Sequence, residues 1–471
     1  MYSSSSQLHL DRLQQLLEKN GECTSLKIQA VLGISQASAS RLLAQQASSE
    51  EGLLVKLGVG RKTRYALAQP IGPYGALQPI WRIDLKGEPH RIGVLTFLAR
   101  SQIHLAGPGI EQTYTSSPAA PLPWFLAPVR AEGFMGRLLA RQLSAQGVAS
   151  LSANPEVWDT QSVLIAATHM HDAPGSLILG SLAGEIATMK APLVSSSSNA
   201  EKLDALAIDV AKSLTGGSSA GGEQPKFTAI GENGEHLIVK FSPPLGTPFG
   251  DRWNDLLCAE ALASEVLLRH GFAAAPARIV RSASRTYLLS TRFDRNTVAG
   301  RQHVVSVGAA HQGFVKGKYE SWESTCFALA QQGRLSLSEA DQVHRLLQFG
   351  RLIGNTDMHS GNASLLVQGQ TLAEILEGGF QLAPVYDMLP MRWKPEPMLG
   401  LQEYQAFEPN LTLVNQTVRG AAQDFWCCLA EHPDVSDSMR KVSNAMSQRM
   451  GVNALSEGET PPVTSNTGDS P

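Results

Sequence analysis

The sequence predicts a mixed α+β protein that is divided into several domains. The chain has 471 residues, which is more than one hydrophobic core normally holds, so roughly two to four domains are expected. With 43% hydrophobic and 17% charged residues, its composition is that of an ordinary globular protein. Segments in which apolar residues alternate, as in strands, occur among segments with a helical period. We therefore expect helices and sheets together.

The net charge and the cysteine content indicate which partners and which cell compartment to expect for the protein. The net charge of -3 argues against general attraction to nucleic acids or membranes, although a local basic patch can exist within that average. The five cysteines are odd in number and show no Cys-x-x-Cys spacing, which argues against zinc and favours a reducing compartment. The N-terminus lacks a secretory pattern, and no apolar run approaches the ~18 residues of a membrane span. We expect a cytoplasmic protein without a membrane partner.

Residues 1–70 predict a small helical unit. A stripe of leucines marks a first helix, which the pair Asn20 and Gly21 ends. Ser25 is expected to cap a second helix, and a tight turn at residues 33–35 leads into a third helix with the sequence SQASASRLLAQQ. Two helices joined by such a turn form the helix-turn-helix pattern.

A predicted hairpin follows the third helix. The segments LLVKLG and RKTRYALA alternate like strands around a glycine-rich turn, in the place of a wing. No acidic residue occurs between Glu51 and Asp84, so this part is locally basic. The unit resembles a winged helix-turn-helix domain, and its expected partner is duplex DNA. The alternative interpretation is a small helical domain used for protein contact or dimerisation. The candidate DNA-binding residues are Gln36, Ser38, Ser40, Arg41, Arg61, Lys62 and Arg64.

Changes in composition mark a boundary, a linker and a disordered segment in the rest of the chain. Residues 72–75 predict a boundary, after which residues 76–195 alternate between strand-like and helical segments. The serine run within residues 193–200 predicts a linker. Residues 453–471 have few large apolar side chains and are expected to be disordered.

A loop rich in glycine and serine opens the region after the linker. Residues 215–230, TGGSSAGGEQPKFTAI, precede the strand-like segment HLIVKF. Glycines permit close approaches, so such a loop can turn its amides towards phosphate oxygens. It is not a P-loop, because no Gly-Lys-Ser/Thr opens a helix. A flexible β-turn is the alternative interpretation.

Lys240 interrupts the apolar strand that follows this loop. A charge in that position must face a partner or water. A lysine beside a phosphate-binding loop can neutralise the α- and β-phosphates of ATP. Glu260, on the next helical segment, is the favoured ion-pair partner, and Glu265 on the same helix is the alternative.

Two further polar segments, NTDMHSGNASLL and LAPVYDMLP, place Asp357 five residues before Asn362 and place Asp387 after a tyrosine. Phosphoryl transfer needs a carboxylate near the attacking hydroxyl and oxygen ligands for Mg²⁺. The strands next to these loops are expected to form a small sheet, and His359 is expected to brace its loop. Each aspartate alone could merely cap a turn. The order of all the segments predicts a kinase-like site for ATP and Mg²⁺.

Together these segments resemble the HipA family of serine/threonine kinases, the toxin components of bacterial toxin–antitoxin pairs. The resemblance extends over residues 80–450 and implies a two-lobed, protein-kinase-like fold. Residues 76–195 would be the family's N-terminal α/β subdomain, residues 200–298 the N-lobe and residues 299–452 the helical C-lobe. The matching stretches are GEPHRIGVLTF, FLAPVRAEGFMGRLLAR, SLILG, SSAGGEQPKFTA, LIVKF, STRFDR, KYES, IGNTDMHSGNASLL and LAPVYDML.

The resemblance also implies a role for each matching residue. Asp357 would be the catalytic base, and Asn362 and Asp387 would bind Mg²⁺. Residues 291–293, from Thr291 to Phe293, would form the hinge beside adenine. The residues implied to bind ATP are Ser219, Ala220, Gly221, Gly222, Glu223, Gln224, Lys226, Lys240, Thr291 and Phe293.

The implied activity is ATP- and Mg²⁺-dependent phosphorylation of a serine or threonine in a cellular protein, with inhibition of growth. Ser219 matches the serine at which the family phosphorylates itself, and Ser218 is the adjacent alternative. Two features depart from the family pattern. Pro225 occurs where other members often carry an acid, and a winged-helix-like unit precedes the kinase region, whereas a separate HipB-like antitoxin usually binds the DNA.

Two other functions remain open from the residues alone. One is a DNA-binding regulator whose kinase-like domain only senses a nucleotide, and such a protein would not need Asp357. The other is a metal-dependent nuclease that uses Asp357, His359 and Asp387, but this function leaves the glycine-rich loop and Lys240 unexplained.

Overall fold

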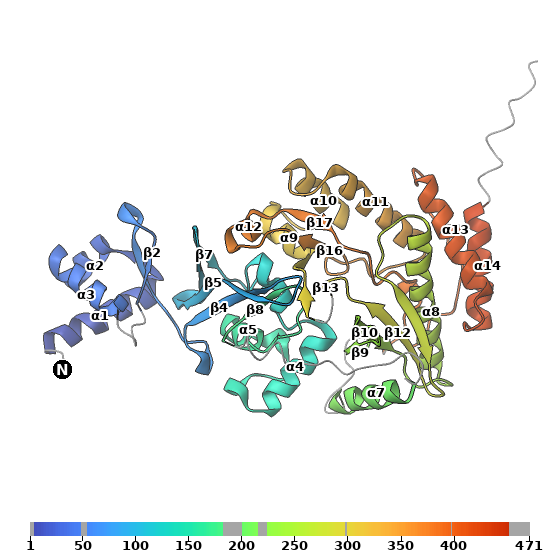
Figure 1. The fold of residues 1–471 in the computed structure, drawn as a ribbon, viewed down its shortest axis with the longest axis horizontal. Coiled ribbons are helices and arrows are strands. Elements are labelled where there is room, and N and C mark those ends of the chain that lie inside the picture. The colour runs from blue at the N-terminus through green and yellow to red at the C-terminus, as the bar shows by residue number, and fades with distance from the viewer. Residues whose placement is uncertain are drawn as a thin grey trace, which may run out of the picture.

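The computed structural model describes residues 4–48, 54–181, 200–214, 224–296, 299–396 and 398–451. Its parts follow one another across the molecule, from the N-terminal helices at the left of Figure 1 to α13 (Gln416–Glu431) and α14 (Asp437–Gly451) at the right. Sheets and helices occur together along the described chain, which confirms the mixed α+β class expected from the sequence.

The N-terminal unit packs three helices against a small antiparallel sheet. One leucine or isoleucine from each helix, namely Leu17, Ile28 and Leu43, is buried in its core. The three helices and the hairpin follow the order of a winged helix-turn-helix unit, and β1 is a strand that the sequence did not predict. The elements are α1 (Ser4–Asn20), β1 (Glu22–Thr24), α2 (Ser25–Leu32), α3 (Gln36–Ser48), β2 (Leu54–Leu57) and β3 (Arg64–Leu67), with strand order β1-β3-β2.

Thr24, and not Ser25, caps α2. The Thr24 side chain accepts a hydrogen bond from the Lys27 amide at 3.3 Å, whereas Ser25 is already the first helical residue. An N-cap residue needs an extended backbone, and Thr24 has one (φ −76°, ψ 156°) because β1 ends there. The capping residue expected from the sequence is therefore wrong by one position.

The next part of the chain is an antiparallel sheet with strand order β7-β6-β5-β4-β8. A short 3₁₀ helix, Trp124–Val129, precedes α4 and is separate from it, because Pro128 has no amide proton and Gly133 adopts a left-handed backbone (φ 60°). The elements are β4 (Leu77–Ile83), β5 (Pro89–Leu98), β6 (Gln102–Gly107), β7 (Ile110–Thr115), α4 (Gly133–Ala145), α5 (Thr160–Ala167) and β8 (Leu177–Leu179).

Hydrogen bonds attach the N-terminal unit to this sheet, and one of them joins the Gln69 amide to the Phe97 carbonyl oxygen at 2.8 Å. The Arg100 guanidinium donates to the Lys19 carbonyl oxygen at 2.8 Å, at the end of α1. The Gly58 amide, between β2 and β3, donates to Glu111 Oε1 of β7 at 2.6 Å. The hairpin is thus fixed on the edge strand of the larger sheet.

A second antiparallel sheet, with strand order β11-β12-β10-β9, lies between two helices. Helix α7 packs on β9, and the long helix α8 packs on β11 and β12 (Figure 1). The elements are α7 (Ala200–Leu214), β9 (Lys226–Ile230), β10 (His236–Phe241), α8 (Pro248–Arg269), β11 (Ala277–Arg281) and β12 (Thr286–Thr291).

The last part of the chain is mainly helical. The sequence predicts the pairing of β16 with β17, and the structure adds β15 as a third strand that the sequence did not predict. The elements are β13 (Arg295–Asn296), β14 (Gly300–Arg301), β15 (Val304–Ser306), α9 (Val307–Phe314), α10 (Trp322–Gln331), α11 (Leu337–Leu352), β16 (Ser364–Val367), α12 (Leu372–Glu377), β17 (Phe380–Leu382), α13 and α14.

A buried ion cluster joins the end of β12 to the segment before β8. Arg292 pairs with Asp172 at 2.7 Å, and Arg295 pairs with Asp294 at 2.6 Å. The Gly175 amide also donates to Asp294 Oδ2 at 2.8 Å. Burial alone would raise the pKa of Asp294, but the two arginines outweigh burial and hold that pKa below its ordinary value. The STRFDR stretch is therefore anchored to the preceding part of the chain.

The predicted linker, residues 193–200, lies outside the described residues except for Ala200, which begins α7. The segment expected to be disordered, residues 453–471, also lies outside them. Within the described ranges, no helix is both long and apolar enough to cross a membrane.

Candidate functional site

Lys240 lies at the centre of the site, in contact with two carboxylates. Its Nζ is 2.6 Å from Glu260 Oε1 and 2.5 Å from Asp387 Oδ1. The Lys240 and Glu260 side chains are each 8% exposed. Glu265, the alternative partner, is 68% exposed and lies 4.0 Å from Arg269 instead. The structure therefore pairs the strand lysine with the glutamate that the sequence favoured.

The alternation of β10 explains why Lys240 faces α8. Leu237, Val239 and Phe241 belong to the apolar cluster that α7 covers. Because neighbouring residues of a strand point to opposite faces, Lys240 points to the other face of the sheet, where α8 supplies Glu260.

Burial and charge oppose one another at this centre. Burial alone would lower the pKa of Lys240, but the carboxylates of Asp387 and Glu260 outweigh burial and hold that pKa above its ordinary value. Burial raises the pKa of Glu260, and Lys240 offsets only part of the rise. Burial acts in the same direction on the pKa of Asp387, but Lys240 and Lys226 outweigh it, so that this pKa is lowered. Asp387 is therefore the more readily ionised of the two acids.

Asp387 is held in an unusual backbone conformation just after an anchored segment. Its φ of 54° lies in the left-handed region, which is uncommon for residues other than glycine. The sequence places Asp387 at the end of a short strand, but β17 already ends at Leu382. Val385 instead makes an isolated bridge to the loop after α8, with backbone hydrogen bonds of 2.9 Å to Ala273 and Ala275. This bridge brings Asp387 beside the sheet that carries Lys240.

The loop of Asp357 is connected to Asp387 through Asn355. The Asn355 Oδ1 accepts from the Asp357 amide at 3.0 Å, and its Nδ2 donates to the Asp387 carbonyl oxygen at 3.2 Å. Asn362 closes the same loop, since its Nδ2 donates to the Asp357 carbonyl oxygen at 2.8 Å. Asn355 belongs to the segment identified from the sequence, but no role was predicted for it. An asparagine two residues before an aspartate in a turn could have indicated the first of these hydrogen bonds.

His359 and Trp322 hold the middle of the loop. The His359 Nδ1 accepts from the Gly361 amide at 3.0 Å, so His359 braces the loop as expected. The Trp322 indole donates to the His359 carbonyl oxygen at 2.7 Å, from the start of α10.

Tyr386 is a second link that the sequence did not indicate. Its hydroxyl donates to the Gly361 carbonyl oxygen at 2.9 Å and lies 2.7 Å from Ser364 Oγ. Its ring is 5.7 Å from that of Phe293, a residue of the predicted hinge. Tyr386 thus contacts the loop of Asp357 and the predicted hinge, and it directly precedes Asp387.

The described residues include only the end of the predicted phosphate loop. Residues 215–223 lie outside them, so the structure places neither Ser218 nor Ser219. Gln224 donates from Nε2 to the Phe241 carbonyl oxygen at 2.6 Å. Lys226 is the neighbour of Lys240 across β9 and β10. The loop therefore ends directly beside Lys240 and its carboxylate partners Glu260 and Asp387, which we call the lysine centre.

The chemistry of these groups fits Mg²⁺. Asp387 offers a carboxylate, and Asn362 offers an amide oxygen because its nitrogen is used in the hydrogen bond to Asp357. Oxygen atoms of this kind are the ligands that Mg²⁺ prefers.

The predicted DNA-binding residues lie in the N-terminal unit, far along the chain from this centre. Ser38 is half-buried, and the Arg61 side chain lies outside the described residues. Arg64 pairs with Glu22 of β1 at 3.2 Å, so the locally basic character inferred from the sequence is reduced by an acid from a neighbouring strand. The members with exposed side chains are Gln36, Ser40, Arg41, Lys62 and Arg64.

Comparison with known proteins connects this site to a family. A HipA-like C-terminal domain matches residues 218–450, and the middle domain of YjjJ-like toxins matches residues 74–187. The toxin YjjJ of Escherichia coli K12 is 32% identical over 438 residues, which are 89% of this chain and 93% of that protein. This chain belongs to the HipA-like toxin family. The family expected from the sequence motifs is confirmed.

Two solved structures are similar to this HipA-like chain at low identity. One is a chain from the Shewanella oneidensis MR-1 toxin–antitoxin complex of HipA, HipB and operator DNA, with a TM-score of 0.48, 17% identity and coverage of 79% of this chain and 95% of that chain. The other is the Helicobacter pylori proinflammatory kinase CtkA, with a TM-score of 0.32, 15% identity and coverage of 50% of this chain and 90% of that chain.

Proposed function

We propose that this HipA-like protein is an ATP- and Mg²⁺-dependent kinase that phosphorylates serine or threonine hydroxyls of a cellular protein. The observation that carries the proposal is the contact of Lys240 with both Glu260 and Asp387. A strand lysine held by a helix glutamate, next to an aspartate that can bind a metal ion, is the arrangement that phosphoryl transfer from ATP uses.

In this proposal each group has one task. Lys240 binds the α- and β-phosphates, and Glu260 holds its ammonium in place. Asp357 orients the acceptor hydroxyl and accepts its proton, while the γ-phosphoryl group leaves the bridging oxygen of ADP and forms a bond to the acceptor oxygen. Asn362 and Asp387 would hold Mg²⁺, which would supply positive charge to offset that of the phosphates. Residues 219–226 cover the phosphates, and Thr291 and Phe293 lie beside adenine.

The biological part of the proposal comes from the family. We propose that the kinase acts in the cytoplasm and inhibits growth, in agreement with the toxin name of its relative YjjJ. A phosphate on Ser219, or on the adjacent Ser218, would add negative charge beside ATP and oppose its binding. A HipB-like antitoxin is a candidate partner, because the Shewanella oneidensis complex contains HipB.

The experiment that tests the proposal is incubation of the purified protein with γ-labelled ATP, Mg²⁺ and cell extract. We expect labelled protein bands that are absent with Asp357→Asn, and label that withstands the neutral hydroxylamine that removes phosphate from acyl phosphates. Transfer to no protein at all, including the kinase itself, would contradict the proposal. A nuclease would instead degrade added DNA or RNA with Mg²⁺ and without ATP.

We also propose that the N-terminal unit binds duplex DNA. Helix α3 carries no acidic residue, and Gln36, Ser40 and Arg41 are exposed on it. Lys62, in the turn between β2 and β3, is also exposed and could contact phosphates beside the groove.

A further inference from the structure

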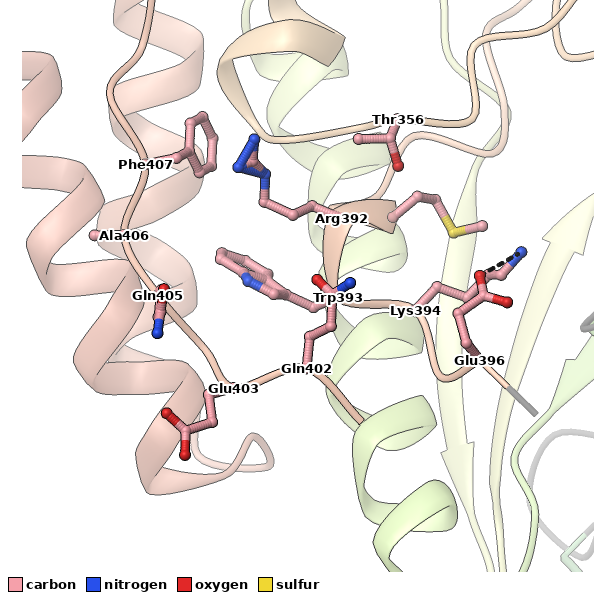
Figure 2. Close-up of a pocket in the computed structure, with 11 residues that line it drawn as sticks. Thr356, Arg392, Trp393, Lys394, Glu396, Gln402, Glu403, Gln405, Ala406 and Phe407 are labelled. Atoms are coloured by element: carbon pink, nitrogen blue, oxygen red, sulfur yellow. Dashed lines mark ion pairs between the residues drawn. The ribbon is translucent and has the colours of Figure 1, made fainter. Parts of the chain in front are cut away.

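A pocket beside the loop of Asp357 has no task in the proposed transfer of phosphate. Its volume is about 830 Å³, and it lies between residues 391–396 and residues 402–407. Figure 2 shows Thr356 at its upper rim, above Arg392 and Trp393. Thr356, which lines this pocket, directly precedes Asp357 in the chain, so the pocket adjoins the loop that carries the proposed catalytic base.

Aromatic packing fixes the walls of the pocket. Trp393 is buried, with its ring 5.2 Å from that of Tyr404 and 6.0 Å from that of Trp426. The Arg392 guanidinium lies over the ring of Phe407, 4.5 Å from its centre. The pocket is therefore formed by packed side chains before any ligand arrives, which reduces the entropy lost on binding.

The charges around the pocket do not favour nucleic acid. Among its described lining residues, the two cations Arg392 and Lys394 balance the two anions Glu396 and Glu403. Lys394 and Glu396 form an ion pair of 3.6 Å, drawn as a dashed line in Figure 2. A surface that attracts a phosphate backbone carries an excess of lysine and arginine.

The uncharged polar groups of the pocket suit a polypeptide. Gln402 and Gln405 line it, and each side-chain amide can both donate to and accept from a peptide backbone. Beside them, Met398 and Leu399 are 95% and 83% exposed. They occupy the tip of a tight hairpin that backbone hydrogen bonds of 3.0 and 2.7 Å close between Glu396 and Gly400. Adjacent large apolar side chains in such an exposed position are typical of a contact surface.

We propose that this pocket, together with the Met398 and Leu399 hairpin, binds the acceptor segment of the protein substrate. The segment is extended, its backbone contacts Gln402 and Gln405, and it carries an apolar side chain that packs on the hairpin beside the acceptor serine or threonine. This inference rests on the proposed kinase function and adds to it where the acceptor segment binds and which kind of side chain that segment carries.

The test uses the full-length protein, γ-labelled ATP and two probes: a library of short synthetic peptides with a central serine or threonine, and unfractionated cell extract. The variant is Met398→Ser combined with Leu399→Ser. The matched control is Leu337→Ser, because Leu337 is 66% exposed on α11 and does not line the pocket. Mg-ATP affinity is measured for every protein.

We expect the parent to prefer peptides with a large apolar residue near the acceptor. The double variant should lose about tenfold in kcat/KM for those peptides, through a higher KM, because an exposed contact is removed. Its Mg-ATP affinity and the activity of Leu337→Ser should stay within about twofold of the parent values.

Other results would overturn the inference and leave the kinase proposal intact. These are equal phosphorylation of the preferred peptides by the double variant and the parent, label on proteins of the extract but on no peptide, or a peptide preference that ignores apolar residues. Label on no acceptor of either probe would instead contradict the proposed function itself.

Discussion

Lys240 is tolerated in an apolar strand because its ammonium has two carboxylate partners, Glu260 at 2.6 Å and Asp387 at 2.5 Å. A buried charge that loses one partner is left with a desolvation cost that the remaining contacts do not offset. Single residues around this ammonium should therefore affect both stability and activity.

The change Glu260→Gln tests this expectation, because it keeps the shape of the side chain and removes its charge. We expect kcat/KM for phosphotransfer to fall by at least about tenfold and the free energy of unfolding to fall by about 1–3 kcal/mol. Enzyme kinetics and chemical denaturation measure the two effects. Glu265→Gln is the control, since Glu265 is 68% exposed and should change stability by less than about 0.5 kcal/mol. Equal behaviour of the two variants would refute the role of Glu260.

His303 should make the stability of the protein depend on pH. It is buried, its Nε2 lies 3.0 Å from the Phe125 carbonyl oxygen, and burial lowers its pKa to about 4. Between pH of about 6.5 and 4 the unfolded chain binds a proton that the folded protein does not bind, so the free energy of unfolding decreases as the pH falls. The contribution of His303 is up to about 1.4 kcal/mol per pH unit. Denaturation of His303→Gln over this range should show a shallower slope than the parent, and an unchanged slope would contradict the assignment.

At the scale of elements, Tyr386 connects the loop of Asp357 to the predicted hinge. Its hydroxyl contacts the Gly361 carbonyl oxygen and Ser364, and its ring lies against Phe293. Tyr386→Phe keeps the ring and removes the hydroxyl. We expect kcat to fall by about tenfold, because the loop loses its hydrogen bond to Tyr386, while Mg-ATP affinity stays within about twofold of the parent value.

Tyr319→Phe is the matched control for this change. The Tyr319 hydroxyl is buried without a hydrogen-bond partner among the described residues, so its loss should leave kcat unchanged. Should Tyr386→Phe weaken Mg-ATP binding and leave kcat unaltered, Tyr386 would be a hinge residue and would have no effect on the loop.

The helices and hairpin of the N-terminal unit lead to a prediction about DNA. The full-length protein should bind duplex DNA with an affinity that falls linearly on a log–log plot against salt. Arg41→Ala, on α3, should relax the choice of sequence, whereas Lys62→Ala should weaken binding to all sequences and reduce the salt slope by about one. Electrophoretic mobility shifts at several salt concentrations distinguish these outcomes, and binding that is insensitive to salt would argue against the proposal.

The sequence predicts a contact in the site more readily when the two residues lie close together along the chain. Asp357 and Asn362 belong to one loop, and the pairing of Lys240 with Glu260 follows from a charge in an apolar strand beside a helix. The contact of Lys240 with Asp387 joins residues 147 positions apart, so only the packing of distant elements creates it. The strand β1 was missed because it has three residues, and with it the pairing of Arg64 with Glu22.

At the scale of the whole molecule, the lysine centre combines a sheet, a helix and two loops from separate parts of the chain. The buried ion cluster around Arg292 and Asp294 fixes the end of β12, and the bridge at Val385 fixes the segment before Asp387. The N-terminal unit is attached to the edge of another sheet through Gly58 and Glu111.

The measurement that tests the proposed kinase most directly is phosphotransfer by Asp357→Asn, with Mg-ATP affinity determined on the same preparation. Because this change removes only the carboxylate that accepts the proton, phosphotransfer should fall by about a hundredfold or more while ATP still binds. Asp387→Asn is the companion variant and should lose Mg-ATP affinity as well as phosphotransfer, since it removes a charged ligand of Mg²⁺. Phosphotransfer by Asp357→Asn near the parent rate would show that the segment NTDMHSGN is not a catalytic loop.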